Sequence, residues 1–576
     1  VGMTGYGRTV FSGHQVESFD VEVIGKLENI APRRNVILAR LTGGPLAQTG
    51  VLEGMSGSPV YLADGKLAGA VAYSWSFSKE PICGITPIEE MLDLLTRQGN
   101  KAEGGDASAD RMAPGAIDML WKPAAVPAFL RHRLESLAAP MLTGGLAPLP
   151  IPTGFSGGAR PGAAGREIDR WESLLTTMGL APVSAGSDAD SKKEPEPPPI
   201  EPGAAMGVQL VRGDLEMAAV GTVTWVHGDR FLAMGHNFLA IGPTALPATR
   251  AEVFGYLPSL ASSFKLATSS TPLGVVTQDR FGGLAGTTKG AAPMVPINVT
   301  LRSTPERESH FSFEVVDDPL LTPILMHLSF LQIFQTAEKA AGDITLSVRK
   351  GSRIRLGGDL DVNLQNLYSG DQSEIIASAT VAYMTYLLMN NPDRASHVAG
   401  VDLDLEYKDA LSLAVIDRMW CDHYTAAPGE TLPLHVSIKP YRGDAFVETI
   451  PLEIPEEAEE GKVILQVGDA ATLSRMEYRA GGVSMQPRNL EQLVFLLNRI
   501  RTNNKIYATL IRPDNGLYIA GERLPNLPPS LSTVLISPGR DEAGAQRVRL
   551  RGILEEERET KYALRGYQKA ILEIKR

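Results

Sequence analysis

The chain has 576 residues, which at about 150 residues per domain predicts roughly four domains. Hydrophobic residues make up 43% of it and charged residues 21%, so the composition is globular rather than disordered. The net charge of −11 argues against a general nucleic-acid binder or a polybasic membrane anchor. The 57 glycines and 40 prolines indicate many turns, so we predict a mostly β protein with some α structure.

Residues 1–99 are predicted to form a strand-rich segment. Apolar and acidic residues alternate over positions 19–23, which is the period of a half-buried strand. Two further apolar runs flank Asp64-Gly65, a dipeptide typical of hairpin turns. The segment ends in a predicted helix, with Thr86 as its N-cap, a proline as its first residue and Gly99 after its end.

Residues 100–202 are predicted to be a linker and helical bridge. Helical patterns occur around 127–138 and 166–179. The stretch Ser184–Pro202 is rich in proline and charged residues, which is typical of an extended linker. Strand patterns return over 203–302.

Residues 303–400 are predicted to be an α/β extension that includes two apolar helices, in Leu320–Phe334 and Ile375–Met389. Both are shorter than the ~18 residues that suggest a spanning helix, so we expect them to pack inside the protein. The alternating strands of 401–470 predict a β-sandwich-like module. Residues 471–576 are predicted to form a C-terminal α/β module.

The sharpest local motif is the hexapeptide Gly54–Pro59, which has the form Gly-x-Ser-Gly-x-Pro found at the nucleophile of chymotrypsin-like serine proteases. In such a turn the amides of Gly54 and Ser56 form an oxyanion hole beside the Ser56 hydroxyl. The α/β-hydrolase elbow requires glycine where this chain has Ser58, and a helix afterwards rather than a hairpin. The simplest alternative is a Gly/Ser-rich turn without chemistry.

A serine nucleophile needs a base, and His236 is the first candidate. It ends an apolar strand and follows a glycine, which is typical of a residue at a barrel rim. His14, in a turn, is the rival base, and His227 resembles an exposed hairpin tip. His423 lies beside Cys421 but has no second ligand pair nearby, so we predict no metal and no cofactor.

The two cysteines of the chain, Cys83 and Cys421, are widely spaced. Such thiols are more often small buried hydrophobes than one long-range disulfide.

Two sequence blocks together resemble the SpoIVB family of serine peptidases, the sporulation-protease type in the chymotrypsin-like group. The first block is TGVLEGMSGSPV at 49–60, which continues through DGKLAGAV at 64–71 to GITPIEEML at 84–92. The second block is GTVT at 221–224 followed by LAMGH at 232–236. The resemblance covers roughly a third of the chain.

This resemblance implies a serine endopeptidase with a double β-barrel core, Ser56 as nucleophile and His236 as base. In the sporulation enzymes the histidine block precedes the serine block, whereas here it follows. We therefore expect permuted halves, with a serine-bearing barrel half at 1–99 and a histidine-bearing half at 203–302. Triads occur in several chain orders, so this order is compatible with catalysis.

The acid of the expected triad is left open. The resemblance implies an aspartate shortly before the serine motif, but residues 40–58 contain none. Asp279 and Asp214 are the two substitutes, and either is also compatible with a turn. A Ser–His dyad without an acid is the third alternative.

The resemblance, with a chain that begins at Val1 rather than Met, implies a secreted or periplasmic protein that cleaves protein or peptide substrates. We expect no nucleic acid and no membrane span, and Ser184–Pro202 as an accessible site for self-processing. The alternative is a catalytically inactive, protease-derived binding or scaffold protein, because residues 303–576 carry no catalytic motif and include β modules suited to partners.

Overall fold

The structure is a computed structural model of residues 1–576. It divides into two compact units: Val1–Ala109, Pro127–Asn298 and Phe311–Thr336 form the first, and Asp110–Val126, Val299–His310 and Ala337–Arg576 the second. The described residues are all except 33, 76, 97–115, 137–145, 156–162, 185–198, 305–306, 337–342, 358–359, 392–396, 480–486, 488, 514–516, 520–521, 525–527, 529, 532–545 and 548–549. Strands predominate over helices, which confirms the prediction of a mostly β fold.

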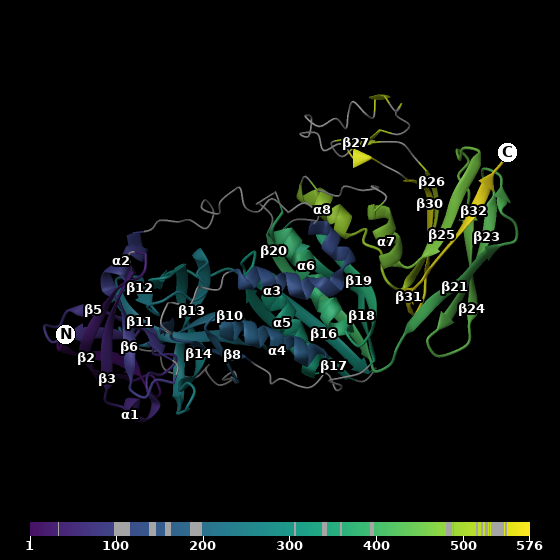
Figure 1. The fold of residues 1–576 in the computed structure, drawn as a ribbon. Helices are drawn as coiled ribbons and strands as arrows, with labels where there is room; N and C mark the ends of the chain where they lie inside the picture. The colour runs from purple at the N-terminus through teal and green to yellow at the C-terminus, as the bar shows by residue number, and fades with distance from the viewer. Residues whose placement is uncertain are drawn as a thin grey trace. The chain divides into compact units, whose positions relative to one another are not determined.

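The first unit begins with a closed ring of six antiparallel strands, drawn in purple in Figure 1. The strands pair in the order β4-β1-β2-β3-β6-β5, and β5 pairs again with β4 to close the ring. We call it the serine ring because it contains Ser56. Its elements are β1 (Thr4–Val10), β2 (Val16–Ala31), β3 (Arg34–Thr42), α1 (Leu46–Thr49), β4 (Pro59–Leu62), β5 (Leu67–Trp75), β6 (Ile82–Pro87) and α2 (Ile88–Thr96).

The alternating residues of β2 behave as the sequence predicts. Phe19 and Val21 are buried in the core of the serine ring, and Asp20 between them is exposed. The turn at Asp64-Gly65 joins β4 to β5, and the Asp64 carboxylate accepts a hydrogen bond from the Lys66 amide. Both features were visible in the sequence because they depend on neighbouring residues alone.

The predicted helix after the ring is present, but its predicted start is wrong. Thr86 and the proline after it are the last residues of β6, and α2 begins at Ile88. The Thr86 hydroxyl donates instead to the carbonyl oxygen of Gly235, 2.6 Å away. Thr86, which matches a helix cap in sequence, therefore joins the end of β6 to the distant turn that contains Gly235.

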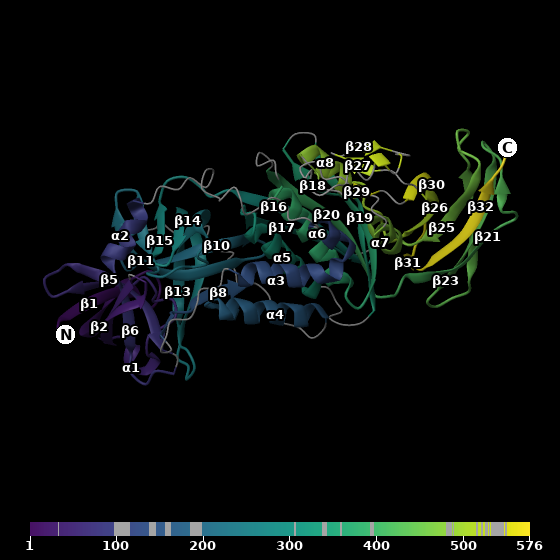
Figure 2. The ribbon, with the colours of Figure 1, turned by 45° about the horizontal axis from the view of Figure 1, so that its top comes forward.

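A second closed ring of six strands lies in the same unit, and Figure 2 shows it beside the first. Its strands pair in the order β10-β13-β14-β15-β12-β11, and β11 pairs again with β10. We call it the histidine ring because His236 lies just after its strand β12. Its strands are β10 (Ala205–Gly213), β11 (Met217–His227), β12 (Arg230–Ala233), β13 (Gly242–Leu257), β14 (Phe264–Arg280) and β15 (Gly283–Thr287).

Shorter elements complete the first unit. α3 and α4 match the two predicted helical patterns of the bridge, and the ring of Trp171 on α4 packs against that of His327 on α5. β8 and β9 extend the histidine ring beyond β11. The bounds are α3 (Val126–Glu135), β7 (Leu146–Pro148), β8 (Ile151–Phe155), α4 (Ala163–Thr177), β9 (Leu180–Ser184), β16 (Met294–Thr304), β17 (Arg307–Val316) and α5 (Leu321–Thr336), the chain passing between the two units within β16 and β17.

The second unit ends in a β-sandwich whose two sheets share one apolar core. One sheet has the order β24-β23-β21-β31 and the other β22-β32-β25-β26-β30. The sandwich therefore uses strands from both sides of residue 470, where the sequence predicted a boundary between two modules. Its strands are β21 (Leu413–Cys421), β22 (Thr425–Ala426), β23 (Thr431–Pro440), β24 (Phe446–Glu453), β25 (Gly461–Gly468), β26 (Lys505–Pro513), β30 (Leu550–Glu559), β31 (Ala563–Arg565) and β32 (Tyr567–Ile574).

The rest of the second unit is α/β. The two apolar helices predicted from the sequence are α5 of the first unit and α6 of the second. Within the described residues, no helix combines the length and apolarity needed to cross a membrane. The remaining bounds are η1 (Ala116–Trp121), η2 (Pro123–Ala125), β18 (Ile344–Leu356), β19 (Asp361–Gly370), α6 (Ser373–Met389), β20 (Val398–Lys408), α7 (Ala470–Arg479), α8 (Leu490–Leu497), β27 (Leu517–Ile519), β28 (Glu522–Leu524) and β29 (Gln546–Arg547).

Candidate active site

The predicted nucleophile lies in a buried turn, which we call the serine turn and define as residues 52–58. Gly54 and Gly57 have φ angles of 88° and 96°, in the left-handed region that favours glycine. A side chain at Gly57 would also overlap the Thr222 carbonyl and the Met234 amide of the histidine ring. The two glycines of the motif are therefore required by the backbone and by the close approach of the second ring.

Hydrogen bonds leave three amides of the serine turn, those of Leu52, Gly54 and Ser56, without a partner among the described residues. The Met55 amide donates to the Leu52 carbonyl, the Gly57 amide to that of Val71, and the Ser58 amide to that of Met55. Within the described part of the chain, the Gly54 and Ser56 amides donate no hydrogen bond. These are the two amides that the sequence predicts for an oxyanion hole.

The Ser56 side chain is fully buried, and its hydroxyl has no hydrogen-bond partner among the described residues. A buried polar group without a partner costs about 1–3 kcal/mol, so such groups are rare in folded proteins and require an explanation. A nucleophile awaiting substrate is one such explanation. The neighbouring Ser58 hydroxyl is also buried and unpaired.

His236 lies just after β12, in a turn that begins with Met234 and Gly235 at positive φ. Its ring is 1% exposed, and Nδ1 lies 2.8 Å from the carbonyl oxygen of Asn237. A carbonyl oxygen only accepts, so Nδ1 carries the proton and Nε2 the lone pair. Nε2 has no partner among the described residues, and burial lowers the pKa of His236 to about 4.

The structure brings the serine turn and the His236 turn together. The Thr222 amide donates to the Ser56 carbonyl, and the Met234 amide donates to the Thr222 carbonyl. No hydrogen bond joins Ser56 Oγ to His236 Nε2, since neither atom has a partner. The turns that carry Ser56 and His236, 180 positions apart in sequence, therefore pack against each other through the backbone of Thr222.

Asp279 does not have the role that the sequence predicts for the acid of a triad. Its carboxylate is buried and accepts hydrogen bonds from the amides of Phe238, Leu239 and Ile241, at 2.8, 2.7 and 3.4 Å. Burial raises its pKa, although these hydrogen bonds oppose the shift. Asp279 holds the loop after His236, while a backbone carbonyl occupies the Nδ1 position expected for an acid.

Asp214 lies away from the His236 ring. It is exposed in the turn between β10 and β11, where its carboxylate accepts a hydrogen bond from the Ser312 amide. Asp214 is thus a turn residue, and the prediction that it orients the imidazole is wrong for this structure.

The three other histidines considered in the sequence make their contacts elsewhere, and neither cysteine is paired. His14 is exposed in the turn between β1 and β2, and the exposed His227 stacks on Trp225. His423 contacts the Glu430 carboxylate, and the described residues contain no cluster of side chains that could hold a metal ion. Both cysteines of the chain are buried free thiols.

Two threonines that bind the serine turn stand in the GTVT block identified in the sequence, but sequence reasoning gave them no role. Thr222 and Thr224 are alternate residues of β11, and their hydroxyls donate to the carbonyls of Gly54 and Gly57 at 3.0 and 2.7 Å. The available signal was a pair of polar residues, two positions apart, inside an otherwise apolar strand. Periodicity alone does not reveal which distant segment such a pair contacts.

It also missed how the end of the β13–β14 hairpin covers the serine turn. The Glu53 amide donates to the Ser263 carbonyl, and the Lys265 amide donates to the Glu53 carbonyl. The Lys265 side chain passes beside Gly54 and is buried, as is that of Glu53. Burial lowers the pKa of Lys265 to about 7 and raises that of Glu53 to about 7.

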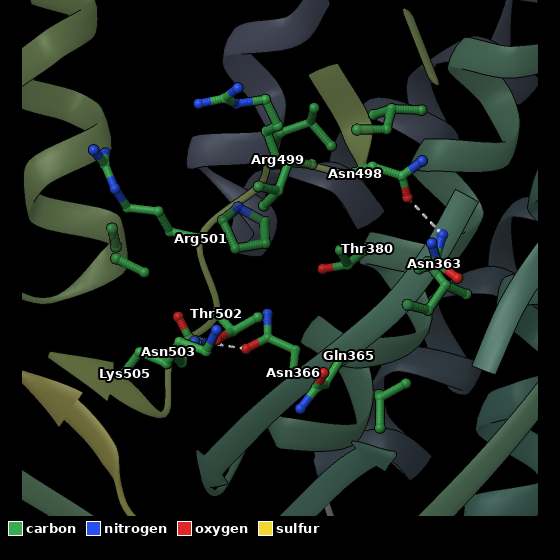
Figure 3. Close-up of a pocket in the computed structure, with 18 of the residues that line it drawn as sticks. Asn363, Gln365, Asn366, Thr380, Asn498, Arg499, Arg501, Thr502, Asn503 and Lys505 are labelled. Atoms are coloured by element: carbon green, nitrogen blue, oxygen red, sulfur yellow. Dashed lines mark hydrogen bonds between the residues drawn. The ribbon is translucent and has the colours of Figure 1, made fainter. Parts of the chain in front are cut away.

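The second unit contains a separate pocket of about 470 Å³, lined by β19, α6 and the segment 498–505 (Figure 3). Arg501 binds Glu477 and Glu555, and Lys505 binds Glu557, whereas Arg499 lies over the ring of Phe495. Several of its amide side chains bind backbone, as Asn366 does in accepting from the Asn503 amide. Several of its polar groups therefore bind one another or the backbone of its walls, while the buried Thr502 Oγ1 has no partner among the described residues.

Comparisons with protein-family models, with curated proteins and with solved structures find no match to this chain.

Proposed function

We propose that this chain is a serine endopeptidase with a permuted, chymotrypsin-like double barrel, as its resemblance to the SpoIVB family implies. The serine ring and the histidine ring supply the two barrel halves. One observation carries the proposal: Ser56 Oγ and His236 Nε2 are both buried and unpaired, on two turns that pack against each other. The unpaired amides of Gly54 and Ser56 support it.

In the proposed reaction, Ser56 Oγ attacks the carbonyl carbon of a peptide bond while His236 Nε2 takes the hydroxyl proton. The amides of Gly54 and Ser56 hold the negative oxygen of the tetrahedral intermediate. The C–N bond then breaks, Nε2 returns the proton to the leaving amine, and an ester remains on Ser56. Water, deprotonated by the same nitrogen, hydrolyses that ester and restores the hydroxyl.

The catalytic pair is a dyad in this proposal. The carbonyl of Asn237 holds the proton on Nδ1 and so presents Nε2 as an acceptor. A neutral carbonyl stabilises the imidazolium less than a carboxylate does. We therefore expect slower turnover than in an enzyme with a complete triad.

Because Ser56 is fully buried, the proposed activity requires a movement that exposes its hydroxyl. The same burial supports the alternative function, a binding or scaffold protein. A peptide reaches the hydroxyl only when a covering segment moves, and the end of the β13–β14 hairpin is bonded beside the turn. If nothing moves, the chain is a binding or scaffold protein on a protease-like core. Protein or peptide partners, self-processing and a secreted or periplasmic location belong to the peptidase proposal.

Labelling with a fluorophosphonate probe tests the proposal, because such probes react with activated serine hydroxyls. We expect the intact protein to label and Ser56→Ala to abolish labelling, with the modified peptide identified by mass spectrometry. Ser58→Ala is the matched control, since Ser58 is equally buried and unpaired, and we expect it to label. Equal labelling of wild type and Ser56→Ala would falsify Ser56 as the nucleophile. A wild-type protein that does not label favours the scaffold alternative.

A further inference from the structure

We infer that Thr222 is a positioning residue for the proposed reaction, linking the serine turn to the His236 turn. This inference rests on the proposed function and adds a residue to its machinery. Thr222 contacts neither substrate nor reacting atoms, so it would act through the residues that it holds.

Three atoms of Thr222 bind three different peptide groups at the seam between the rings. Its amide donates to the Ser56 carbonyl at 2.8 Å, and its hydroxyl donates to the Gly54 carbonyl at 3.0 Å. Its own carbonyl accepts from the Met234 amide at 3.2 Å, at the start of the turn that carries His236. One buried residue therefore fixes both sides of the proposed dyad.

The hydroxyl of Thr222 controls one particular peptide plane. A peptide group is planar, so holding the Gly54 carbonyl fixes the whole unit between Gly54 and Met55. That unit lies between the units that carry the unpaired amides of Gly54 and Ser56. Its orientation therefore sets how those two amides lie relative to each other, which an oxyanion hole requires.

Thr224 provides a matched control on the same strand. Its hydroxyl donates to the Gly57 carbonyl at 2.7 Å, and it is buried like Thr222. Each threonine holds a peptide unit whose N–H already donates within the turn, Met55 to Leu52 for Thr222 and Ser58 to Met55 for Thr224. The two differ in position, because only the unit that Thr222 holds lies between the units of the Gly54 and Ser56 amides. Replacement of either threonine by valine removes one buried hydroxyl and leaves one carbonyl unpaired, so both should lower stability similarly.

The experiment compares the rate of fluorophosphonate labelling and the melting temperature of wild type, Thr222→Val, Thr222→Ser and Thr224→Val. We expect Thr222→Val to label about 10-fold to 100-fold more slowly, because small misplacements of catalytic groups have effects of this order. Thr222→Ser should restore the rate, and Thr224→Val should label within about threefold of wild type at a similar melting temperature. The pH dependence of the residual labelling should be unchanged, because the imidazole and its Asn237 partner remain.

Several outcomes would overturn the inference. Thr222→Val labelling at the wild-type rate would show that the hydroxyl is structural only, and an equal loss in Thr224→Val would show a general effect of destabilisation. If Thr222→Val does not fold, Thr222→Cys, whose thiol is a weaker donor, replaces it, and labelling at the full rate overturns the inference. Absence of labelling in the wild type removes the proposed function and this inference with it.

Discussion

The candidate active site and the pocket of the second unit differ in how their polar groups are paired. In the pocket, Arg501 and Lys505 are matched by carboxylates, and amide side chains such as Asn366 bind neighbouring backbone. In the candidate active site, Ser56 Oγ and His236 Nε2 are fully buried without partners. The pocket also has one such atom, Thr502 Oγ1, so what distinguishes the candidate site is the type of its unpaired groups, a hydroxyl and an imidazole on adjoining turns.

Removal of the proposed base is the strongest test of this contrast. We expect His236→Gln to slow fluorophosphonate labelling by about 10²–10⁴-fold, the usual contribution of general-base catalysis. His227→Gln, which changes an exposed histidine of the same ring, should label like wild type. If His236→Gln labels at the wild-type rate, the unpaired imidazole has no catalytic role. The unpaired groups of the candidate site would then not indicate catalysis.

The pH dependence of stability tests whether the imidazole of His236 is buried in its neutral form. His236 has a pKa of about 4 when folded, well below the ordinary value of 6.5, because burial disfavours its charged form. As pH falls from about 6.5 to 4, the unfolded chain binds a proton that the folded chain does not, so stability decreases. The decrease attributable to this group approaches about 3 kcal/mol.

Urea unfolding at several pH values measures this effect. Other groups titrate in the same range, so the informative quantity is the difference between wild type and His236→Gln. We expect the wild type to lose more stability than the variant as pH falls. If the stability of wild type and of His236→Gln falls in parallel, the imidazole takes up its proton at the same pH in the folded and the unfolded chain.

The smallest expected effect concerns the pocket. Arg501 is 11% exposed and binds Glu477 and Glu555 through contacts of 2.5–3.1 Å. Arg501→Ala leaves two carboxylates without a cation and should lower the free energy of unfolding by about 2 kcal/mol, between the values for exposed and buried ion pairs. Chemical denaturation measures this loss, and labelling of Ser56 should not change.

Arg499→Ala is the control for the pocket. Arg499 is exposed and lies over the ring of Phe495, so its removal should change stability by no more than about 0.5 kcal/mol. A larger loss at Arg499 than at Arg501 would show that pairing is not what stabilises this region.

The sequence predicted the features that depend on neighbouring residues. The alternation around Phe19, the hairpin at Asp64-Gly65 and the glycines of the serine turn all follow from local backbone requirements. The nucleophile and base candidates also came from short motifs, and the structure places them on abutting turns.

Features that depend on distant pairing could not be predicted. Thr86 matched a helix cap in sequence, yet its hydroxyl bonds Gly235, which is 149 positions away. Asp279 was identified as an acid near the histidine, but only the fold reveals that it binds backbone amides. The sandwich uses strands from both sides of residue 470 because sheet partners need not be neighbours in the chain.

The division of the proposed dyad between two rings has a consequence for the newly made protein. Ser56 leaves the ribosome long before His236, and each ring closes through its own strand pairs. Under the proposed function, the Ser56 hydroxyl therefore has no proton acceptor while only the first ring has been made. Hydrolysis of peptide bonds would begin only when the later ring has folded against the earlier one.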